Sequence, residues 1–202
     1  MDNEPLGRFA GFIAEEGVRR ARRQAQLFEQ ELATCAFSCD GTQRRDLMIA
    51  FAFLNWSIAN GVWSNLNNTR LRRDLMEATV QKFSTELAKT VTAGSDVRDV
   101  ALEAVRIDEQ LRQMLRGWVG TLGELDRFGA NDARASLFFA MDRIQACLGI
   151  SDPVMDLLVP RFLAHEDFAA EMEHLASQLN RAADDRSKKG TLSRFLEGFR
   201  KD

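Results

Sequence analysis

The chain has 202 residues, of which 45% are apolar and 28% charged, with a net charge of −3. That length suffices for one domain with a substantial core, and the acidic balance argues against a dedicated nucleic-acid binder, which usually presents a strongly basic face. Three cysteines in no disulfide-rich pattern favour a reduced, cytoplasmic compartment, and the opening MDNEPLGRFAG predicts no secretory signal because it lacks an apolar core.

Residue usage predicts an all-α protein. There are only three prolines and no tyrosine, whereas strong helix formers such as Leu, Ala, Arg and Glu are plentiful. No segment alternates with the period of two that strands require. We therefore expect a single-domain helical bundle of roughly six to eight helices over residues 1–183, followed by a polar hinge and a short basic amphipathic helix in residues 184–202.

The first half of the chain predicts two or three long helices. The first is expected over residues 9–37 and ends at Asp40-Gly41-Thr42, where Thr42 is the expected N-cap of the next helix. The second extends to about residue 67. Either NNT at 67–69 breaks the helix there, or the helix continues through residues 70–91. AGSD at 93–96 ends it, with Ser95 or Asp96 as the following N-cap.

The second half predicts further helices of ordinary length. Gly129 and Gly149 mark two helix ends, and Pro153 suits the first turn of the next helix. Pro160 is expected to kink or divide that helix, because proline removes a backbone donor. The expected ranges are residues 97–128, 132–148, 153–183 and 192–200.

The longest apolar run, residues 47–63, predicts a helix buried on both sides. Its length approaches that of a membrane span, but Asn55, Ser57, Asn60 and Ser64 interrupt it, and polar groups at membrane depth are costly. At helical spacing the run forms two opposed apolar stripes, so we expect protein around its first half. The stripes are Ile49, Phe53, Trp56, Asn60 and Trp63, continued by Asn67, on one side, and Leu47, Phe51, Leu54, Ile58 and Val62 on the other.

Core packing explains most of that helix, but it leaves the amide of Asn60 unexplained. A buried amide must find hydrogen bonds or cost a few kcal/mol. Asn60 is therefore expected either to fix the register of packed helices or to meet a ligand between Trp56 and Trp63.

Few residues suggest metal chemistry. Asp167, Glu171 and His174 share a helix face and form the weak candidate for a metal site, against the simpler interpretation of a solvated polar face. Glu171 and His174 form one Glu-x-x-His pair. A di-iron bundle would need a second such pair, which the chain lacks. His165 falls on a row of apolar residues and is expected at the edge of the core.

Other clusters have structural explanations. Cys35, Cys39 and Cys147 are expected to be buried reduced thiols rather than redox or metal ligands, since a structural zinc site needs four ligands. The glycines in GWVGTLG, at 117, 120 and 123, indicate close packing or a kink. The arginine runs at 19–23 and 70–73 are expected on exposed helix faces.

The end of the chain predicts a separable docking element. Residues 152–185 carry a net charge of −6, whereas residues 186–201 carry +5. The basic tail also carries a short apolar stripe at helical spacing, and a helix of this kind needs a surface to lie on. That surface is expected to be the protein's own body, a sister subunit, a partner protein or an anionic membrane. The expected tail residues are Leu192, Arg194, Phe195, Leu196 and Phe199.

Together these patterns predict a non-catalytic cytoplasmic interaction or regulatory module that self-associates or binds a protein partner, without nucleic acid or cofactor. The alternative is a sensor or carrier of a small apolar ligand, with its pocket around Trp56, Asn60 and Trp63. A metal-binding bundle enzyme is the third hypothesis.

Overall fold

The computed structural model describes residues 4–63, 69–93, 96–125 and 132–165, with side-chain surroundings left out at 4–9, 58–63, 69–72, 75, 119–125 and 132–135. The described residues form six helices and no strand, which confirms the all-α bundle. The expected division at residue 184 lies outside them. The helices are α1 (Glu4–Thr34), α2 (Gly41–Trp63), α3 (Thr69–Val91), α4 (Val97–Leu125), α5 (Asp132–Leu148) and α6 (Asp152–His165).

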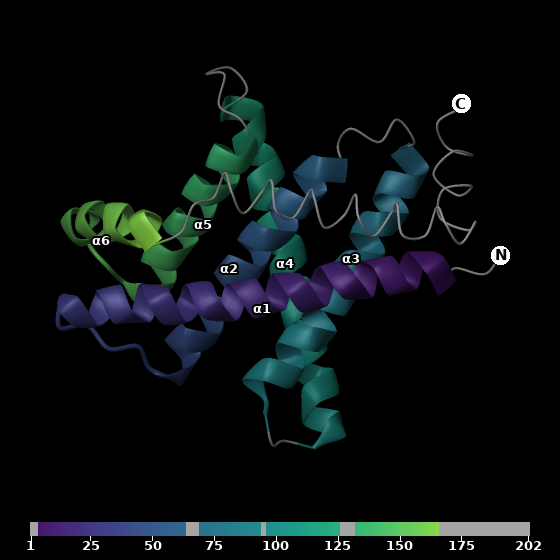
Figure 1. The fold of residues 1–202 in the computed structure, drawn as a ribbon, viewed down its shortest axis with the longest axis horizontal. Coiled ribbons are helices and arrows are strands. Elements are labelled where there is room, and N and C mark those ends of the chain that lie inside the picture. The colour runs from purple at the N-terminus through teal and green to yellow at the C-terminus, as the bar shows by residue number, and fades with distance from the viewer. Residues whose placement is uncertain (1–3, 64–68, 94–95, 126–131, 166–202) are drawn as a thin grey trace.

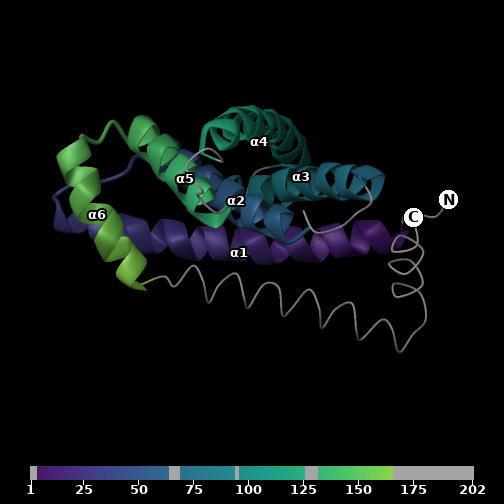
Figure 2. The same cartoon turned by 90° about the horizontal axis from the view of Figure 1, so that it is seen from above.

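The helices are arranged in layers around α2. The long helix α1 crosses in front of the other helices in Figure 1 and packs against α2, α3 and α6. Turning the molecule shows α4 on the side opposite α1, with α2 and α3 between them (Figure 2). Because α2 also packs against α5 and α4, it contacts more of the bundle than any other described helix.

The first half of the apolar run at 47–63 is surrounded by protein, as its two apolar stripes predict. Every residue from Ile49 to Ser57 is buried. On one side Phe51 packs with Phe28 of α1 and Phe162 of α6, at ring-centroid distances of 5.9 and 5.2 Å. None of the described helices is long and apolar enough to cross a membrane.

Small residues bring α1 close to its neighbours. Its inward face carries the buried residues Ala10, Ala14, Gly17, Ala21 and Ala25 at intervals of three and four. At Gly17 the ring of Phe83 from α3 fills the space in front of the backbone. A Cβ added there would lie 2.2 Å from Phe83 Cζ, well inside van der Waals contact.

The structure corrects two predicted helix ends. The first helix ends at Thr34, before Ala36, which adopts a left-handed conformation with φ of 58°. The backbone N–H of Phe37 then donates to the carbonyl of Leu32 at 3.1 Å and closes the helix end. The next helix is capped by Asp40 rather than Thr42. The Asp40 carboxylate accepts from the Gln43 N–H at 2.8 Å, while the Gln43 side chain accepts from the Asp40 N–H at 3.0 Å.

The later helix ends agree better with the sequence. Asp96 caps α4 by accepting a hydrogen bond from the Asp99 N–H at 2.9 Å. Gly149, with φ of +66°, follows the end of α5 as a left-handed residue. Pro160 does not divide α6, which continues through it to His165.

The contact at Gly17 predicts opposite effects for two glycine-to-alanine changes in one helix. Gly17→Ala is expected to lower the free energy of unfolding by about 1–3 kcal/mol, because the buried Phe83 ring must move. Gly11→Ala is the matched control, since nothing lies within 4 Å of its added Cβ. That control should raise stability by about 0.5–1 kcal/mol through helix propensity. Urea denaturation measures both, and equal stabilisation by the two changes would contradict the close approach.

Candidate functional site

Trp56 lies in an aromatic cluster between α2, α4 and α5. It is buried and packs against Phe53 of the same helix, with ring centroids 5.7 Å apart. Phe53 also meets Trp118 of α4 at 6.3 Å and Phe139 of α5 at 5.4 Å. Gly117 allows Phe139 to approach α4, because a Cβ there would lie 3.2 Å from the ring. This geometry supports the packing interpretation for Gly117.

The two tryptophans of this cluster carry buried donors. Trp56 Nε1 and Trp118 Nε1 have no hydrogen-bond partner among the described residues. A buried donor without an acceptor costs free energy, so an acceptor would be stabilising there. The side chains of Asn60 and Trp63 lie outside those that the structure describes. The ligand pocket around Trp56, Asn60 and Trp63 therefore stays a prediction.

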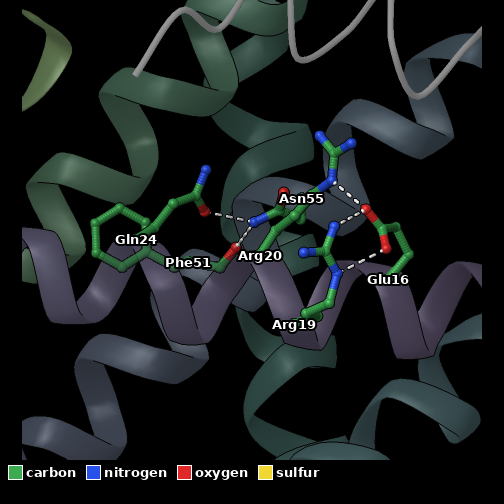
Figure 3. A network of polar contacts seen from close by, with 6 residues as sticks. All are labelled: Glu16, Arg19, Arg20, Gln24, Phe51 and Asn55. Carbon is green, nitrogen blue, oxygen red and sulfur yellow. Dashed lines mark hydrogen bonds and ion pairs between the residues drawn. The ribbon is translucent and has the colours of Figure 1, made fainter. Parts of the chain in front are cut away.

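The buried amide that the structure does describe on α2 is Asn55, one and a half turns before Asn60. Its Nδ2 donates to Gln24 Oε1 of α1 at 2.6 Å and to the Phe51 carbonyl at 2.8 Å (Figure 3). Gln24 and Asn55 are 1% and 5% exposed. This pair links α1 to α2 through side chains in the core. The sequence showed Asn55 as an amide within an apolar run, but it did not identify Gln24 as its hydrogen-bond partner.

One arginine of the run at 19–23 is buried beside this pair. Arg19, Arg22 and Arg23 are exposed as expected, whereas Arg20 is only 5% exposed. Arg20 Nε donates to the Glu16 carboxylate at 2.9 Å, and Arg19 donates to the same carboxylate at 2.6 Å (Figure 3). Burial acts to raise the pKa of Glu16, but the hydrogen bonds and charges of the two arginines outweigh it and lower the pKa.

Charged residues also fix α4 on its inner side. At the start of α2, Arg45 Nε donates to the buried Glu103 of α4, and Arg45 Nη1 donates to Asp46 at 2.8 Å. Farther along α4, Arg112 bonds Asp108 of the same helix at 2.6 Å and Glu77 of α3 at 2.8 Å. The helix is therefore held against both α2 and α3 by ion pairs.

The three cysteines are free thiols, as expected. Cys39 is buried, and Cys35 and Cys147 are half-buried. Burial, aided by the negative charge of Asp46, raises the pKa of Cys147 to about 11, and burial also raises the pKa of Cys39. At neutral pH both groups are protonated, which disfavours nucleophilic and metal-binding roles because both need the thiolate.

The remaining candidates from the sequence are not assembled in the part of the chain described here. His165 is exposed rather than at the core edge, and its Nε2 lies 3.1 Å from the Glu31 carboxylate. Within the described ranges no three His, Cys, Asp or Glu side chains group closely enough to hold a metal ion. The metal candidates Asp167, Glu171 and His174 lie outside those ranges. So do the tail residues Leu192, Arg194, Phe195, Leu196 and Phe199.

Sequence reasoning missed an exposed apolar patch on α4. Leu102 is 52% exposed and Val105 68% exposed, and the small Ala101 beside them is also exposed. On the opposite side of the helix Ile107, Leu111 and Met114 are buried in the core. The helix thus has an inner face that packs and an outer face that carries apolar side chains into solvent. The spacing of residues 102 and 105 from the inner stripe could have revealed this second face.

Comparisons with protein-family models, with curated proteins and with solved structures found no match to this chain.

The Gln24–Asn55 bond predicts a strong interaction between two substitutions. Asn55→Leu and Gln24→Leu are each expected to lower the free energy of unfolding by about 1–3 kcal/mol, because each leaves a buried polar partner with a bond unmade. The double variant should lose clearly less than the sum of the two. Gln26→Leu, at an exposed glutamine of the same helix, serves as the control and should change little. Strictly additive losses in denaturant titrations would show that the two amides do not depend on each other.

Proposed function

We propose that the chain is a non-catalytic cytoplasmic interaction and regulatory module, and that the outward face of α4 is its binding surface. The observation that carries this proposal is the exposure of Leu102 and Val105 side by side on a helix otherwise fixed in the bundle. Apolar side chains on an outer face add nothing to the core, and clustered ones often mark binding sites.

Three features support a binding role over catalysis. The buried amides of Gln24 and Asn55 bond each other, and the half-buried carboxylate of Glu16 bonds neighbouring arginines, as structural groups do. The raised pKa values of Cys39 and Cys147 suit thiols that fill space. The ion pairs of Arg45 and Arg112 link α4 to α2 and α3, so its outer face is presented on a helix that already has a place in the bundle.

A photo-crosslinking residue at position 102 tests this proposal in cells that make the protein. We expect a defined protein adduct, which is identified by mass spectrometry as a second copy of the chain or another protein. The adduct should disappear when Val105→Glu is added, because a charge on the same patch opposes apolar contact.

The same crosslinker at Asp142, an exposed position on α5, provides the control. Leu102→Gln should change the free energy of unfolding by no more than about 0.5 kcal/mol, which separates binding from folding. No adduct from position 102, or the same adducts from both positions, would contradict a binding role for the α4 face.

A further inference from the structure

Four exposed residues form a continuous stripe along the outer face of α4. Arg98, Leu102, Val105 and Glu109 follow one another at intervals of four, three and four residues. This is the spacing with which one helix presents a seam to another in a coiled coil. Figure 2 shows α4 at the margin of the molecule, on the side away from α1. A second helix can therefore lie along this stripe.

The stripe is complementary in charge and apolar character to a second copy of itself that runs in the opposite direction. Its two apolar residues occupy the centre, and its ends carry opposite charges. Neither Arg98 nor Glu109 makes an ion pair with another described residue, whereas Arg106 beside the stripe pairs with Glu103 at 3.7 Å. When two copies of the helix run antiparallel about a two-fold axis between positions 103 and 104, Leu102 of one copy faces Val105 of the other. In the same arrangement each Arg98 faces a Glu109.

We propose that α4 binds α4 of a second copy of this chain in an antiparallel pair, an inference that rests on the proposed function of this face. The charges select the direction, because a parallel pair would set Arg98 against Arg98 and Glu109 against Glu109. In the same register the small side chain of Ala101 in each copy faces Arg106 of the other and leaves room for that longer side chain.

The size of the contact sets the expected strength. One helix face from each copy falls at the low end of protein interface areas. The dimer should therefore dissociate with a Kd of about 1–100 µM, and added salt should weaken it because two of its contacts are exposed ion pairs.

Sedimentation equilibrium of the full chain, from about 1 µM to about 500 µM, tests the pairing. The unaltered chain is expected to shift from monomer to dimer across this range. Arg98→Glu and Glu109→Arg should each raise the Kd by about tenfold or more, because each places like charges together twice. The double variant Arg98→Glu/Glu109→Arg should restore the dimer, since exchanging both charges restores the complementarity.

Arg116→Glu is the matched control. Arg116 is exposed on the same side of α4, but the position opposite it would precede Val97, where α4 of the antiparallel copy begins, so the Kd should not change beyond the effect of net charge. Circular dichroism of each variant checks that the bundle is intact. Restoration by the double variant is the result that supports the antiparallel register.

Two results would overturn the inference. One is a dimer that neither single charge reversal weakens, which would place the contact on another surface. The other is a monomer at every concentration. In that case an adduct from position 102 to a different protein would still support the proposed binding face, whereas the absence of any adduct would overturn both proposals.

Discussion

Burial of residues 49–57 of α2 on all sides is the constraint on which the rest of the bundle depends. A helix surrounded by protein cannot leave a polar side chain to water, so Asn55 must find its hydrogen bonds inside the core. Gln24 supplies one of them at 2.6 Å, and this fixes α1 against α2 in rotation as well as position. The small residues of α1 then let α3 approach α1 closely, with Phe83 of α3 packed against Gly17. Together these contacts define the arrangement of α1, α2 and α3.

The position of α4 follows from that arrangement. With α1 on one side of α2 and α3, α4 lies on the other, where Ile107, Leu111 and Met114 complete the core (Figure 2). Ion pairs from Arg45 to Glu103 and from Arg112 to Glu77 hold it there. A helix at the margin of a bundle needs only one apolar face for its own packing. Leu102 and Val105 on the other face take no part in this packing, which is why we propose a binding role for them.

Much of the fold follows from helix periodicity, whereas individual polar contacts do not. Two opposed apolar stripes on residues 47–63 predicted a buried helix, and the structure confirms its first half. Periodicity did not show that Asn55 has a partner, because that partner, Gln24, belongs to another helix and lies 31 residues earlier in the chain. The arginine run at 19–23 likewise gave no sign that Arg20 is the buried member. The end of α1 was misplaced because Ala36, not a glycine, adopts the left-handed conformation there.

Native-state hydrogen exchange of the full chain measures the central role of α2 most directly. The amides of residues 49–57 should exchange only through global unfolding, with protection equal to the free energy of unfolding from denaturant titrations. The amides at the start of α4, near residues 98–105, should exchange through smaller openings. Exchange of α2 as fast as that of α4, or through a partial opening that leaves α4 protected, would contradict a bundle built around α2.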